Sequence, residues 1–368
     1  MKKMSIAAEK QSSRNPAYDI ARGIAMLCVV FAHTGYQIPG EMKRFAFSFH
    51  MPLFFLLSGY FFHPLPMGQC VRKTIRNYCV PYFLTCIFII LIHIGISLVQ
   101  GVSPWPRTFR FLAAMLYGSG SRTDGPALWP TKFYAIGAIW FLLALAWGQI
   151  VLNAVLLGFR KAAGMAGEKQ QTTGFQHIAV FGISYAAYYM SNHGVWLPLS
   201  LEAGLFAVGL IYLGYMARQA GTEGLRFPLP VYLVFLIIAV YMSLHGGKFL
   251  LVGNRSMDLP MDIIGSLSIS FLVIRFSSWV SARLNGRGGL LGFIGKRTLP
   301  ILCVHCCEAK FLKWTTQVPD YLNSIGIAPS WLLLCVLRCL VIAAGVAVLA
   351  LIPGVNTLFR LKNQRRKE

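Results

Sequence analysis

The sequence predicts an all-α integral membrane protein. Of its 368 residues, 56% are hydrophobic and 12% are charged, and the mean hydropathy is +0.59. A soluble domain usually carries about 25% charged residues. The apolar residues also gather into runs close to the roughly 20 residues that a helix needs to cross a hydrocarbon core. We expect about ten transmembrane helices, at residues 17–36, 44–63, 77–99, 134–157, 175–190, 198–217, 229–245, 259–280, 297–313 and 331–352.

The basic residues between these runs predict the orientation. With the N-terminus in the cytoplasm, the cytoplasmic segments carry about twice as many Lys and Arg residues as the external ones, as the positive-inside rule requires. Both termini are therefore expected in the cytoplasm, with the protein in the cell membrane. The start of the chain has no apolar core and no cleavage site, so we expect it to be retained. The expected parts are a basic tail (1–16), a membrane domain (17–353) and a second basic tail (354–368).

The net charge of +22 does not indicate a nucleic-acid-binding protein. The basic residues flank apolar runs and are not interleaved with exposed aromatic residues. Orientation and contact with anionic membrane lipids explain them better. The nine cysteines are odd in number and lie mostly inside apolar runs, which favours buried thiols over disulfides. The external loop 100–133 is rich in Pro and Trp and is expected to form an ordered cap.

Arg22 and His33 are the most informative residues, because both lie in the first apolar run. An ionisable group at membrane depth costs at least about 2–3 kcal/mol and usually has a function. On a helix the two residues lie about 16 Å apart along the axis. Arg22 is then near the cytoplasmic face and His33 near the external face. The second run adds a further imidazole, His50.

At this point the sequence resembles a known family. Arg22 and His33 are followed by Phe49-His50-Met51-Pro52-Leu53-Phe54-Phe55 and Ser58-Gly59-Tyr60. This pattern resembles the membrane acyltransferase family three, in particular the branch grouped with fucose 4-O-acetylase. The basic stretch 72–82, the Trp-Phe-Leu helix 139–145 and the segment 294–305 are similar to later parts of the same family, with Thr298 where serine is commoner.

The resemblance implies an O-acyltransferase. The donor would be cytoplasmic acetyl-CoA, no metal is expected, and the acceptor would be a hydroxyl of a cell-envelope carbohydrate or a related molecule. The resemblance places the catalytic role on His33, as a general base or as a transient acyl carrier. Arg22 would bind a CoA phosphate or polarise the thioester carbonyl, or it would pair with Asp19 three residues away.

The remaining candidates each have a functional and a structural interpretation. Arg72, Lys73 and Arg76 would bind the phosphates of CoA, or they would only signal topology. His50 would take part in catalysis or form a helix–helix hydrogen bond. His305 and Glu202 are candidate substrate-binding residues. Glu308 would orient the His305 imidazole, and Glu202 would otherwise be a solvated carboxylate at a helix start, favoured by the helix dipole.

The alternative function is a secondary transporter of a small solute or an envelope precursor. Ten spans with polar residues at membrane depth and Pro or Gly breaks are compatible with transport. No inverted repeat is visible in the sequence, and inverted repeats are typical of such transporters. A Gly-x-Ser-x-Gly turn is missing as well, so a serine nucleophile has no support.

Overall fold

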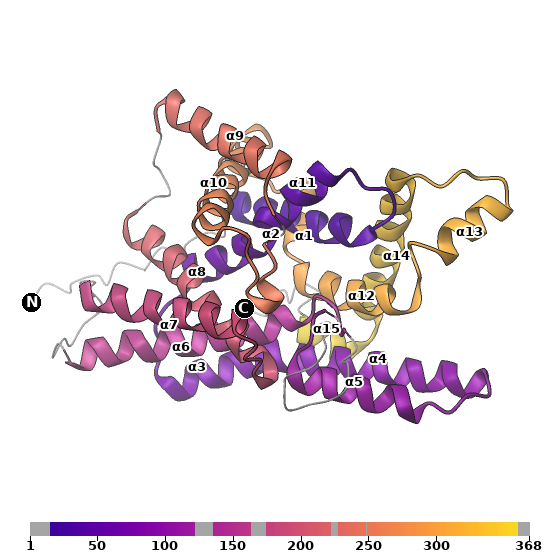
Figure 1. Cartoon of the computed structure of the whole chain (residues 1–368). Helices are drawn as coiled ribbons and strands as arrows, with labels where there is room; N and C mark the ends of the chain where they lie inside the picture. The colour runs from indigo at the N-terminus through magenta and orange to yellow at the C-terminus, as the bar shows by residue number, and fades with distance from the viewer. Residues whose placement is uncertain (1–14, 122–134, 163–173, 222–226, 248, 360–368) are drawn as a thin grey trace, which may run out of the picture.

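The computed structural model describes residues 15–121, 135–162, 174–221, 227–247 and 249–359, which are predominantly helical (Figure 1). These residues contain no β-strand, and one isolated bridge pairs Leu250 with Arg255. The longer helices are α1 (Pro16–Thr34), α2 (Gly40–Tyr60), α4 (Val80–Val99), α6 (Trp140–Ala162), α7 (Gly174–Asn192), α8 (Leu201–Gln219), α9 (Leu229–Leu244), α10 (Leu259–Arg283), α12 (Thr298–Phe311) and α14 (Trp331–Leu351).

Five shorter helices complete the described chain. They are α3 (Met67–Thr74), α5 (Trp105–Tyr117), α11 (Gly289–Gly295), α13 (Gln317–Ser324) and α15 (Pro353–Phe359). A π-helical segment (Ile75–Cys79) joins α3 to α4, so that Met67–Val99 forms one long helical stretch. α5 lies in the loop 100–133, which was predicted to be external and ordered, while residues 122–133 of that loop lie outside the described residues.

Local sequence signals fix both ends of α1. The Asn15 side chain accepts a hydrogen bond from the backbone N–H of Ala17 at 3.0 Å, and Pro16 supplies a preset φ for the first turn. Gly35 ends the helix with φ of 79°, a left-handed conformation that glycine adopts without a steric penalty. Between these ends α1 is unbroken, and the positions of Arg22 and His33 are therefore rigidly related.

α1 and α2 occupy the centre of the bundle (Figure 1). α1 packs against α2, α10, α11, α12 and α14, whereas α2 packs against α8, α9 and α10. Glycine allows the closest of these approaches: a Cβ atom at Gly59 of α2 would collide with the Ile211 carbonyl of α8, and one at Gly295 of α11 would collide with the Asp19 carbonyl of α1.

All ten predicted runs contain a helix, which confirms the all-α class. Within the described part of the chain, six helices are long and apolar enough to cross a membrane, or seven if α11 and α12, bent by 73°, form one span. α2 begins with the charged residues Glu41, Lys43 and Arg44, and α9 has only 16 residues. The count of ten spans and the cytoplasmic position of both termini therefore stay predictions.

Two helix boundaries differ clearly from their predictions. The helical stretch predicted at 77–99 begins ten residues earlier, at Met67. The run 134–157 was expected to be helical throughout, but α6 begins at Trp140. The backbone N–H of Ile136 instead donates to the Ser119 carbonyl at 2.7 Å, which ties the preceding segment to the end of α5. Apolar composition alone could not distinguish this buried loop from a helix, because Ile136 and Ile139 are as buried as residues within α6.

Candidate active site

Arg22 and His33 project from nearly the same line along α1. They are about three turns apart, and a helix repeats its facing direction at that spacing. Met26 and Val29 lie between them at spacings of three and four residues and share this face. The four side chains therefore form one wall that runs about 16 Å along the helix.

A cavity of about 310 Å³ lies against this wall. Arg22 and Lys73 line one end of it, and Val29 and Met51 lie farther along α1 and α2. Most of the surface between these ends is apolar, formed by Met26, Phe54, Phe141, Leu142, Leu145 and Leu302. The cavity thus runs from a cationic mouth to Val29, about one turn before His33, through a passage suited to an uncharged chain.

The mouth of the cavity contains hydrogen-bonded polar groups as well as cations. Gln149 Nε2 donates to Ser58 Oγ at 2.7 Å and to the Tyr78 hydroxyl at 3.0 Å. Arg22 Nη1 lies 3.4 Å from Asp19 Oδ1, and the guanidinium lies 5.0 Å from the centre of the Phe61 ring. Arg22 therefore pairs with Asp19 and also lines the cavity, so the two roles considered for it are compatible.

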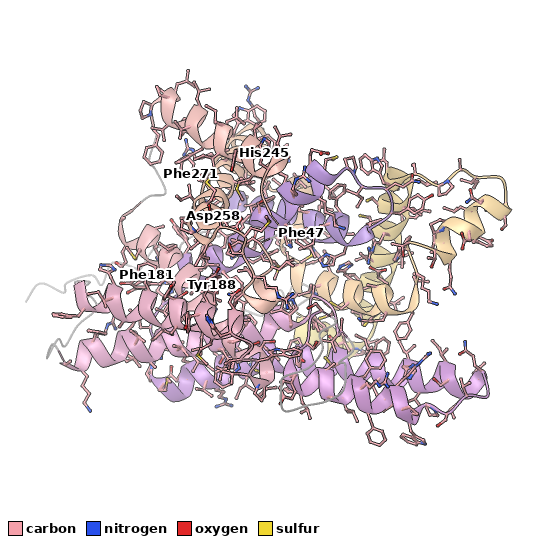
Figure 2. All side chains as sticks on the ribbon, viewed as in Figure 1. Phe47, Phe181, Tyr188, His245, Asp258 and Phe271 are labelled. Carbon is pink, nitrogen blue, oxygen red and sulfur yellow. The ribbon has the colours of Figure 1, made fainter. Side chains whose placement is uncertain are left out.

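His33 stands beyond the far end of this cavity, next to two other histidines. Its ring centre lies 5.5 Å from that of His305 and 5.8 Å from that of Phe47. Phe47, labelled in Figure 2, also lies 5.3 Å from the ring of His50. His33 is exposed to solvent, whereas His50 and His305 are 1% and 2% exposed. Among the three imidazoles, His33 is the one that an incoming molecule can reach most directly.

Hydrogen bonds define which ring nitrogen of each histidine is available. Nδ1 of His33 lies 2.8 Å from the Val29 carbonyl, and Nδ1 of His50 lies 2.5 Å from the Ala46 carbonyl. A carbonyl oxygen only accepts, so Nδ1 carries the proton in both rings and Nε2 keeps its lone pair when the ring is neutral. Each Nε2 can therefore accept a proton, as a general base requires.

Glu308 orients the third imidazole, that of His305, through a hydrogen bond. Its Oε1 accepts from His305 Nδ1 at 2.8 Å and from Arg338 Nε at 2.7 Å, and its Oε2 accepts from Trp314 Nε1. The predicted orientation of His305 by Glu308 is confirmed. The sequence did not reveal the roles of Arg338 and Trp314, because α14 and the segment after α12 meet Glu308 only through tertiary packing. Within the described residues, no group of three or more His, Cys, Asp or Glu side chains is placed to hold a metal.

The predicted basic cluster at the start of the third span is divided by the structure. Lys73 lines the cavity together with Arg22. Arg72 and Arg76 line a different hollow, formed with Met67, Val71 and Val80. Arg72 and Arg76 are four residues apart and share a helix face, whereas Lys73 is turned by about 100° from Arg72.

Glu202 lies apart from these groups. It is 1% exposed at the beginning of α8, where its Oε2 accepts from the Leu197 backbone N–H at 3.1 Å and its carbonyl accepts from Asn254 Nδ2 at 3.1 Å. Its described contacts do not connect it with His33 or with the cavity. Glu202 lies in the first turn of a helix as expected, but the prediction that it is solvated there is wrong, because the side chain is buried. Its role in substrate binding stays a prediction.

The fold and the site define a multi-helix membrane protein with a site suited to group transfer. A family model described as an acyltransferase domain, that of acyltransferase family 3, matches residues 15–350. The chain therefore belongs to this family of acyltransferases, which confirms the resemblance found in the sequence, and the transporter alternative has no supporting observation. No curated protein and no solved structure matches the chain.

Proposed function

We propose that this protein transfers an acetyl group from acetyl-CoA to a hydroxyl of a cell-envelope carbohydrate or a related acceptor. The observation that carries the proposal is the arrangement along α1, where a cationic cavity mouth and an exposed imidazole stand on one helix face. Acetyl-CoA is an anion with a long uncharged arm that ends in the reactive thioester. The phosphates fit Arg22 and Lys73 at the mouth, and the arm fits the apolar passage toward Val29.

In the proposed reaction, the acceptor approaches His33 from the exposed side. Nε2 of His33 takes the proton of the acceptor hydroxyl while the hydroxyl oxygen attacks the thioester carbonyl carbon. The tetrahedral intermediate then collapses, the carbon–sulfur bond breaks, and the thiolate of CoA leaves with the proton that the imidazolium returns. Nδ1 of His33 donates to Val29 throughout, which keeps Nε2 directed away from that carbonyl.

The His305–Glu308 pair supports a second position for proton transfer in the same cluster. Glu308 holds the Nδ1 proton of His305, so that Nε2 of this ring accepts as well. The separation of 5.5 Å between the His33 and His305 rings leaves the two imidazoles within the reach of one substrate group. We assign proton abstraction to His33 because it is the exposed member of the pair.

The test uses purified protein in nanodiscs, acetyl-CoA with a labelled acetyl group and a cell-envelope acceptor fraction. The His33→Ala variant should transfer acetyl about 10²–10⁴-fold more slowly, which is the usual contribution of a general base. The matched control is His193→Ala, because His193 is exposed after α7 and stacks on Tyr189 outside the site. Full activity of His33→Ala would remove this residue from the mechanism, and the absence of acceptor-dependent transfer by the wild-type protein would refute the proposed function.

A further inference from the structure

A second cavity, of about 500 Å³, lies on the other side of α2 from the first. α8 and α10 each pack against α2, and the cavity fills the wedge between them. Leu57 of α2 lines both cavities, so that this helix forms the partition. The walls are mainly apolar and include Leu56, Leu213, Phe235 and Phe271; Figure 2 labels Phe271 on α10.

One end of this cavity is cationic. Arg275 of α10 lines it together with Ser278 of the same helix and Asn15 at the start of α1. The Arg275 side chain is half-buried, yet it has no hydrogen-bond, ion-pair or ring partner among the residues that the structure describes. Arg22 and Arg338, by contrast, are both paired with carboxylates. Because a charged group at membrane depth is costly, an arginine without such a carboxylate is expected to bind an anion that the described protein does not supply.

The wall that α10 contributes has a polar end and an apolar end. Ile264, Phe271 and Arg275 recur at helical spacing and face the cavity, and Ile264 lies about 16 Å along the axis from Arg275. Ser270 also lines the cavity, and its buried Oγ has no hydrogen-bond partner in the described structure. The shape is an apolar slot closed at one end by a guanidinium.

The surroundings of the slot indicate which molecule fills it. Leu233 and Ile237 of α9 and Ile264 of α10 are 48%, 67% and 48% exposed, as expected for side chains that face hydrocarbon. The slot therefore lies among groups that contact lipid. A membrane lipid combines an apolar chain with a phosphate, and guanidinium groups bind phosphate through paired, charge-assisted hydrogen bonds.

We propose that this slot binds an anionic phospholipid, with its phosphate on Arg275 and one acyl chain along α10 toward Ile264. The site is separate from the acyl-transfer cavity, and the proposal does not depend on the proposed reaction. Its location explains why Arg275 has no carboxylate partner in the described protein. The lipid would also pack against Tyr18 and Tyr60, which join the slot to the ends of α1 and α2.

The experiment uses full-length protein in nanodiscs that contain phosphatidylglycerol with a photoactivatable group on one acyl chain. After illumination and digestion, labelling is mapped and quantified on the α10 peptides. The wild-type protein should be labelled between Ile264 and Phe271, and unlabelled phosphatidylglycerol should compete better than phosphatidylcholine of the same chain length. The Arg275→Gln variant should lose about tenfold in labelling, the change that corresponds to one lost charge-assisted hydrogen bond.

Arg283→Gln is the matched control, because Arg283 is exposed on the same helix and lies against Trp279 outside the slot. This variant should be labelled like the wild-type protein. Ser268→Phe places a ring in the slot and should abolish labelling with Arg275 intact; it also serves as the test if Arg275→Gln does not fold. Unchanged labelling in either slot variant, equal competition by the two lipids, or displacement by soluble glycerol phosphate would overturn the proposal.

Discussion

Glu308 is the residue whose removal should destabilise the candidate active site most. The Glu308→Ala variant leaves the guanidinium of Arg338, which is 1% exposed, without its carboxylate. It also leaves the N–H groups of His305 and Trp314 without an acceptor in a buried region. Breaking a buried ion pair by removing one partner costs about 3–5 kcal/mol, and we expect the free energy of unfolding to fall by that amount.

A double-mutant cycle tests whether this cost comes from the stranded charge. Arg338→Met removes the cation and keeps much of the side-chain volume, so that Glu308→Ala combined with Arg338→Met leaves no uncompensated charge. The double variant should therefore be more stable than the sum of the two single changes predicts, by about 1–3 kcal/mol. The measurement is unfolding in mixed micelles with increasing denaturing detergent, followed by tryptophan fluorescence.

The exposed pair formed by Glu41 and Arg44 provides the control. Its oxygen and nitrogen lie 3.1 Å apart at the start of α2, but both side chains contact solvent. Glu41→Ala should therefore lower the free energy of unfolding by less than about 1 kcal/mol. If the effects of Glu308→Ala and Arg338→Met were simply additive, or if Glu308→Ala cost no more than Glu41→Ala, the interpretation of this network as a buried, coupled ion pair would be wrong.

Two further predictions concern helix packing and the donor. Gly59→Ala should lower the free energy of unfolding by about 1–3 kcal/mol, because the new methyl group meets the Ile211 carbonyl. Gly182→Ala is the control and should not destabilise the protein, because nothing lies near that position. Equal effects of the two variants in the same unfolding assay would contradict the close α2–α8 contact. Lys73→Ala should raise the KM for acetyl-CoA about tenfold, the effect of one lost contact to a phosphate. Arg76→Ala should leave this KM unchanged, because Arg76 lines another hollow. If steady-state kinetics showed a higher KM for Arg76→Ala than for Lys73→Ala, the donor would bind in the hollow that Arg76 lines.

The positions of the helices could be predicted from the sequence, because runs of apolar residues near helix length are the main signal in a membrane protein. The number of spans could not be predicted equally well. α12 lies within the predicted run 297–313 and α11 lies directly before it, yet the chain bends by 73° between the two helices, at Lys296 and Arg297. Gly295, next to this bend, packs against the Asp19 carbonyl of α1, a contact that appears only when the helices are assembled.

The site shows the same division between local and tertiary information. The common face of Arg22 and His33, and the contact of His305 with Glu308, follow from helical spacing within one segment. The Glu308–Arg338 pair joins α12 to α14, and the proximity of His33 to His305 joins α1 to α12. No periodicity within a segment encodes such pairs. The division of Lys73 from Arg76 does not follow from spacing, because residues three apart share a helix face, yet the two line different cavities.

The central position of α1 explains how one helix would connect the two ends of the proposed reaction. Its first turns are held by the glycine contact with α11, which keeps the Asp19–Arg22 pair at the cavity mouth. Its last turns meet α12, where the Glu308 network fixes the orientation of His305 beside His33. A continuous helix keeps the two ends at a constant separation of about 16 Å. In the proposed reaction, the donor would therefore have to be extended to bring its reactive carbon to the imidazole, as a donor with a long arm between its charged group and its acyl group could be.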